Sequence, residues 1–109
     1  MSLIKKSKDR IVNFEFNKEY IKVITEKISS SDANFINNSF KEMHPADAAD
    51  IIEHLSQEDR EKLIKLNNFK IDPAIFIELN EAIQTEITKY LSNESIVFIL
   101  KNLDSDDAI

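Results

Sequence analysis

The chain has 109 residues, which is enough for one domain with a modest core. It contains no glycine, which excludes the glycine-rich loops that bind nucleotide phosphates, and no cysteine, which excludes disulfides and thiolate metal sites. The net charge is −6, and residues 31–109 carry sixteen acidic side chains against seven basic ones. An acidic body argues against a nucleic-acid partner, because phosphate contacts need a basic face.

Residues 1–16 show no clear pattern, and we expect them to be an N-terminal segment that can be disordered. From residue 17 on, apolar residues recur at helical spacing, which predicts helices over roughly 17–29 and 32–43. The longest unbroken apolar run covers residues 96–100, far short of the roughly 20 residues that a membrane span needs. We therefore expect a soluble chain without a membrane span.

From residue 44 on, the helical pattern repeats at a regular interval. Two helix starts are marked by proline, at Pro45 and at Pro73, where the missing N–H costs nothing. Leucines at spacings of 11 to 13 residues close the apolar stretches, and each is followed by a residue suited to cap the next helix: Leu55 and Ser56, Leu66 and Asn67, Leu79 and Asn80, Leu91 and Ser92, Leu103 and Asp104. Two helices of about 12 residues per repeat indicate an all-α fold of stacked helical hairpins, an α-solenoid with six to seven helices. A non-repeating bundle with evenly spaced helices is the alternative.

The end of the chain carries two further signals. Val97 and Phe98 make the last full helix apolar on nearly all sides, which predicts that this helix is sandwiched between neighbours. Residues 104–107 then read as a cap and an acidic first turn, which predicts a break after Leu103 and the start of another helix. Because a helix start is useful only when more chain follows, we expect the domain to be truncated at Ile109.

No combination of serine, histidine and acid has a spacing that suggests catalysis, and we expect that the chain is not an enzyme. His44 and His54 are ten positions apart, roughly 80° out of register on a helix, so they cannot chelate a metal as a close pair. We interpret His44 as the residue that enters the helix before Pro45. An acidic strip on the same helix, formed by Asp47, Asp50 and Glu53, is interpreted as a solvated face.

Residues 44–55 have the sequence HPADAADIIEHL, which resembles the segment that opens the cytosolic N-terminal domain of MgtE-type magnesium transporters. Residues 56–60 resemble the next helix start of that family, and residues 103–108 resemble its late LDPDDAAD repeat. The resemblance covers about residues 40–109, and residues 17–39 more loosely. It implies that residues 17–109 form a right-handed superhelix of helical repeats.

The resemblance also implies a function, a metal site and partners. In this family the domain is a cytosolic magnesium sensor on the inner side of the plasma membrane, and it closes the pore when carboxylates between domains bind Mg²⁺. Asp106 and Asp107 match the family's acidic pair and would supply metal ligands, although the same carboxylates also favour the N-terminus of a helix. Mg²⁺ would bind weakly, shared with domains absent from this chain. The implied partners are the CBS domains and the pore domain of the same full-length protein, which we expect to be a homodimer.

A second function remains open. A helical protein–protein interaction module without an ion role, resembling the middle segment of flagellar motor switch proteins, would show the same helical periodicity.

Overall fold

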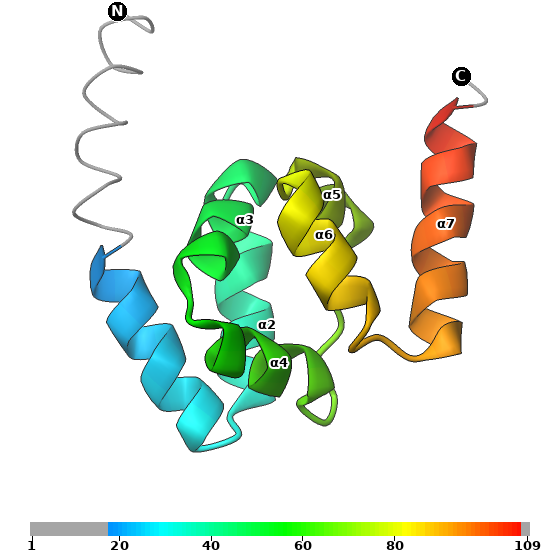
Figure 1. The fold of residues 1–109 in the computed structure, drawn as a ribbon. Coiled ribbons are helices and arrows are strands. Elements are labelled where there is room, and N and C mark those ends of the chain that lie inside the picture. The colour runs from blue at the N-terminus through cyan, green and yellow to red at the C-terminus, as the bar shows by residue number, and fades with distance from the viewer. Residues whose placement is uncertain (1–17, 108–109) are drawn as a thin grey trace, which may run out of the picture.

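The structure, a computed structural model, describes the backbone of residues 18–107 and the side chains of residues 18–103, and every regular element in that part is a helix (Figure 1). The first helix covers residues 18–29. The helices that follow are α2 (Ala33–Glu42), α3 (Pro45–His54), α4 (Gln57–Lys65), α5 (Pro73–Glu78), α6 (Glu81–Thr88) and α7 (Asn93–Asp107). The all-α expectation and the count of six to seven helices are confirmed for this part of the chain. Residues 1–17, including the predicted N-terminal segment, lie outside it.

Helix starts agree with the cap residues at several predicted positions. Ser56, Asn80 and Ser92 each accept, through a side-chain oxygen, the amide of the residue three positions further on, at 3.0–3.1 Å. His44 performs the same task before Pro45, because its Nδ1 accepts the amide of Ala46 at 3.2 Å. Each of these bonds satisfies one of the donors that a helix N-terminus leaves without an intrahelical partner.

The predicted helix cap at Asn67 is wrong. Asn67 does not start a helix: the chain turns there, Asn68 has φ of 73°, and the next helix begins only at Pro73 after its cap Asp72. Asparagine tolerates this left-handed conformation, and the side-chain amide of Asn37 donates to the carbonyl of Asn68 at 2.9 Å, which fixes the turn against α2.

The predicted break after Leu103 is also wrong, because α7 runs without interruption to Asp107. The physical reason lies in the residue types. Residues 103–107 include no proline or glycine, and aspartate and serine cost a helix interior only a few tenths of a kcal/mol each. The acidic residues therefore extend α7 and do not begin a new helix.

The helices stack in two alternating rows. In one row α3 packs on α5 and α5 packs on α7, and in the other α4 packs on α6. This alternation is the arrangement expected of consecutive helical hairpins, in which each unit contacts the next. The helix at residues 18–29 and α7 lie at opposite ends, with α2–α6 between them (Figure 1). The right-handed superhelix stays a prediction.

A single apolar core runs through the described residues, from the first helix to α7. Its largest fully buried side chains come from the first helix, α2, α3, α4 and α6: Ile24, Ile36, Ile51, Ile52, Leu63 and Ile87. The described part of α7 contributes one buried side chain, Ile99. The core is therefore concentrated in the middle of the molecule and thins toward α7.

Candidate functional site

A largely buried ion pair joins three helices at the centre of the molecule. Arg60 of α4 is the one charged residue classed as buried in the described part of the chain. Its Nε and Nη2 atoms donate to the two carboxylate oxygens of Glu86 in α6, each at 3.0 Å. Tyr90 completes the cluster, because its hydroxyl donates to the same carboxylate at 3.0 Å. This two-point geometry is the strong form of an arginine–carboxylate contact.

The remaining guanidinium nitrogen of Arg60 donates hydrogen bonds to the C-terminal end of α3. Nη1 donates to the carbonyl oxygens of Leu55 at 2.6 Å and Glu53 at 3.1 Å, and reaches that of Ile52 at 3.4 Å. The last carbonyls of a helix lack intrahelical donors and carry partial negative charge, so a cation is well placed there. Arg60 therefore stabilises the junction of α3, α4 and α6.

The contacts in this cluster shift the pKa values of Glu86 and Tyr90. The hydrogen bonds from Arg60 hold the pKa of the Glu86 carboxyl below its usual 4.5, although burial acts in the opposite direction. Burial raises the pKa of Tyr90 above its usual 10.0. Glu86 is thus ionised and Tyr90 neutral at neutral pH. A fully paired cluster of this kind stabilises a fold, and nothing in it is left for a substrate to contact.

The acidic strip on α3 is only partly the solvated face that the sequence predicted. One of its three members, Glu53, accepts the backbone amide of Asn80 at 2.7 Å and so ties α3 to the start of α6. A second, Asp50, lies beside His54, with 3.6 Å between its carboxylate and the His54 Nδ1. Within residues 18–103 no group of three or more histidine or acidic side chains is placed to hold a metal ion.

Asp106 and Asp107, the predicted metal ligands, lie in the last turn of α7. Their side chains fall outside the described part of the structure. Both residues therefore lie at the C-terminal end of α7, the helix that forms one end of the described part of the molecule (Figure 1). Because they are consecutive, they are separated by about 100° around the helix axis.

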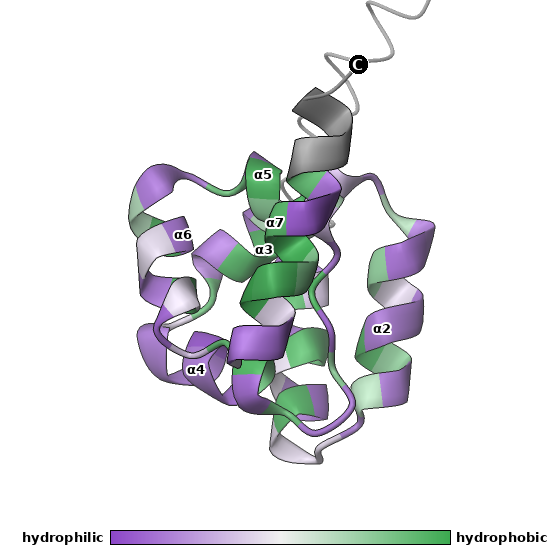
Figure 2. Ribbon diagram, turned by 90° about the vertical axis from the view of Figure 1, so that its right-hand side faces the viewer, coloured by the Kyte–Doolittle hydropathy of each residue, from purple (hydrophilic) through white to green (hydrophobic). Residues whose placement is uncertain are grey.

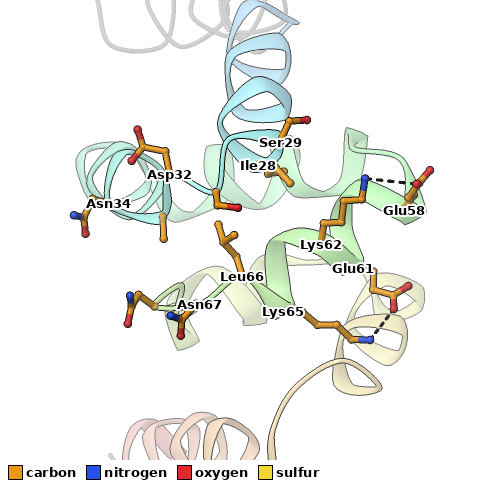
Figure 3. Close-up of a pocket in the computed structure, with 13 residues that line it drawn as sticks. Ile28, Ser29, Asp32, Asn34, Glu58, Glu61, Lys62, Lys65, Leu66 and Asn67 are labelled. Atoms are coloured by element: carbon orange, nitrogen blue, oxygen red, sulfur yellow. Dashed lines mark hydrogen bonds and ion pairs between the residues drawn. The ribbon is translucent and has the colours of Figure 1, made fainter.

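A cavity of about 930 Å³ lies between the end of the first helix, the start of α2 and α4 (Figure 3). Its charged side chains are already partnered: Lys62 lies 3.6 Å from Glu58, and Lys65 lies 2.7 Å from Glu61. These pairs are exposed and contribute about 0–1 kcal/mol each. The cavity has neither a buried unpaired group nor a cluster of like charge that would select a ligand.

The predicted sandwiching of the last helix is not what the structure shows. Val97, Phe98 and Leu100 of α7 are 51%, 54% and 53% exposed, while Ile99 is buried. In Figure 2, where α7 lies at the front, the middle of its ribbon has the colour of hydrophobic residues. Of the described residues, those of α5 cover one side of the helix. The wide apolar stripe therefore leaves part of the apolar side of α7 exposed.

Sequence reasoning did not identify the Arg60 cluster. The available signal was composition: the chain has only two arginines, and Arg60 is the one within the repeats. Arginine is the residue type best suited to a buried, two-point ion pair. Its partner, Glu86, lies 26 residues away, so no local pattern connects them.

A family model described as the MgtE intracellular N domain matches residues 43–109. The matched segment begins directly after α2 and covers α3 to α7. No curated protein and no solved structure matches the chain. In the described residues, no helix is both long enough and apolar enough to cross a membrane.

Proposed function

The chain belongs to the MgtE intracellular N domain family, and we propose from this that it is the cytosolic, magnesium-sensing regulatory domain of a magnesium transporter. The observation that carries the proposal is the family match, which covers more than half of the chain. In the proposed mechanism, Mg²⁺ bound between this domain and its neighbours in the same protein brings them together and closes the pore. Loss of Mg²⁺ separates the domains, and the pore opens.

The donor chemistry at the end of α7 fits this ion. Mg²⁺ prefers oxygen ligands, keeps several of its waters and is usually held by one or two carboxylates. Asp106 and Asp107 supply carboxylates, but consecutive positions on a helix face different directions. One ion therefore takes one of them, and the rest of its shell comes from water or from a neighbouring domain. A site of this kind is weak and empties readily, as a sensor of an abundant ion requires.

Electrostatics explains how such a site can act as a switch. Two carboxylates about 4 Å apart repel by about 4 kcal/mol at an effective dielectric constant of 20. A divalent cation between them converts this repulsion into attraction. An acidic domain that approaches an acidic neighbour therefore remains apart without Mg²⁺ and associates with it, and the chain carries a net charge of −6.

The rival function is a helical interaction module with no role for an ion. The exposed apolar face of α7 suits docking under either function, so it does not separate them. The family match favours the transporter domain. A response to Mg²⁺ located at residues 106 and 107 is the property that the rival lacks.

The proposal is tested by adding MgCl₂ to the ¹⁵N-labelled chain, while a parallel sample receives KCl at equal ionic strength. We expect Mg²⁺ to move the amide signals of Asp106 and Asp107 more than K⁺ does, without saturating, because part of the ligand set is missing. Asp106→Asn should reduce this difference. Identical shifts in the two salts, or a saturable Mg²⁺ site elsewhere in the chain, would overturn the proposal.

A further inference from the structure

A groove of about 430 Å³ lies beside the exposed face of α7. Three elements form it: the C-terminal half of α2, the segment that leads from the turn at Asn68 into α5, and α7 itself. Its apolar lining includes three side chains of the core, Phe40, Ile71 and Ile75, together with Phe98 of α7. Phe98 differs from the other three because it is 54% exposed, whereas they are buried.

The walls of the groove are held in place by hydrogen bonds. Asn37 of α2 donates to the carbonyl of Asn68, at 2.9 Å, which ties the connecting segment to α2. Asn102 of α7 donates to the carbonyl of Phe98, at 2.8 Å. Phe69, next to the turn, packs edge-on against Phe40 with 6.1 Å between the ring centres. The connecting segment is therefore fixed against α2, and the Asn102 bond lies within α7.

The charge of the groove is opposite to that of the domain. Lys41 and Lys70 line it, and neither forms an ion pair with any of the described residues. Its one carboxylate, Asp72, already accepts the amide of Ala74 as the cap of α5. Residues 31–109 carry nine more acidic than basic side chains, so two lysines beside an apolar floor form a local exception.

We propose that this groove binds an acidic amphipathic helix of a protein partner. The apolar side of that helix would cover Phe98 and the apolar floor of the groove, and its flanking carboxylates would contact Lys41 and Lys70. Docking of an amphipathic helix into an apolar groove is a recurring mode of peptide recognition. A nucleic acid is disfavoured, because the acidic body around the two lysines repels a long polyanion. The inference does not rest on magnesium.

The test measures binding of a labelled synthetic helix to the whole chain by fluorescence anisotropy. The probe carries a leucine stripe flanked by glutamates, and the matched control probe carries lysines in place of the glutamates. We expect the acidic probe to bind and the basic probe to bind at least about tenfold more weakly. Equal binding of both probes, or no binding of the acidic one, would overturn the proposal.

Variants locate the binding site. Phe98→Ala and the double variant Lys41→Glu, Lys70→Glu should each weaken binding of the acidic probe by about tenfold or more. The controls are Phe35→Ala, an exposed phenylalanine outside the groove, and Lys22→Glu, an exposed lysine on the first helix. Circular dichroism confirms that each variant folds. If the controls weaken binding as much as the groove variants do, the probe binds elsewhere and the proposal fails.

A second copy of the chain is the other candidate occupant, and sedimentation equilibrium separates the two. We expect the wild-type chain to remain monomeric at the concentrations used for binding. A dimer that Phe98→Ala dissociates would place a second copy on this surface and overturn the proposal.

Discussion

The centre of the molecule and its α7 end differ in how far their side chains are buried. At the junction of α3, α4 and α6, the Arg60 guanidinium contacts a carboxylate and three carbonyls, and these three helices carry large apolar side chains that are fully buried. Along α7, three large apolar side chains are more than half exposed and one is buried. The contrast teaches that the buried contacts that stabilise the domain are concentrated away from α7. The centre fixes the fold, and the end that contributes little to the core is where we propose that a partner binds.

Arg60→Ala should produce the largest loss of stability. It leaves the nearly buried Glu86 carboxylate without its cation and frees the last carbonyls of α3, and breaking a buried pair in this way costs about 3–5 kcal/mol. Lys62→Ala is the matched control on the same helix, where an exposed pair contributes about 0–1 kcal/mol. Urea unfolding measures both. Equal losses in the two variants would show that the central pair has no special role.

The contrast in burial can be tested with two substitutions that shorten a side chain to alanine. Ile52→Ala, at a fully buried position of α3, should cost about 2–5 kcal/mol, because it removes apolar contacts and leaves a cavity. Leu100→Ala, at a position 53% exposed on α7, should change the free energy of unfolding by no more than about 0.5 kcal/mol. A large loss at Leu100 in urea unfolding would mean that the α7 face belongs to the core after all.

Acid should weaken the centre specifically through Glu86. Because the pKa of this carboxyl is lowered in the folded state, its contribution to stability is present above its unfolded value near 4.5 and is lost as pH falls through the folded pKa. The difference in free energy of unfolding between wild type and Glu86→Gln should therefore shrink as pH falls below 4.5. Glu58→Gln, at an exposed pair, should differ little from wild type at any pH. A wild type–Glu86→Gln difference that is independent of pH would contradict the account.

The smallest expected change in stability comes from two asparagines that the sequence pattern predicts to be helix caps. Asn80→Ala removes the cap of α6 and should cost about 1 kcal/mol. Asn67→Ala, at an exposed turn position that caps no helix, should change stability by less than about 0.5 kcal/mol. Thermal unfolding of both variants checks the difference, and equal effects would restore Asn67 as a helix start.

The helices and most of their starts could be predicted because their signals are local. Proline at Pro45 and Pro73, cap residues such as Ser56, and apolar residues at helical spacing act within a single helix. What escaped prediction depends on contacts between distant residues. Asn67 has the residue type of a cap, but the contact between Asn37 and Asn68 fixes a turn there.

For the candidate site, too, some features could be predicted from the sequence and others could not. Sequence resemblance pointed to Asp106 and Asp107, and the family match agrees with that resemblance without testing either residue. The wide apolar stripe of α7 was visible in the sequence, but its exposure was not. A stripe shows that a surface is apolar, and only the packing of the neighbouring helices shows which part of it is covered.

The central claim is that the end of α7 responds to magnesium, and protease protection in the full transporter tests it most directly. The segment that joins this domain to the next is digested over a range of Mg²⁺ concentrations, for wild type, Asp106→Asn and the control Glu94→Gln. Glu94 is an exposed acid in the first turn of the same helix, so the control removes the same charge at the opposite end. We predict that Asp106→Asn needs more Mg²⁺ than wild type for protection, and that Glu94→Gln does not. If Asp106→Asn is protected at the same Mg²⁺ concentration as wild type, Asp106 is not a metal ligand and the account is wrong.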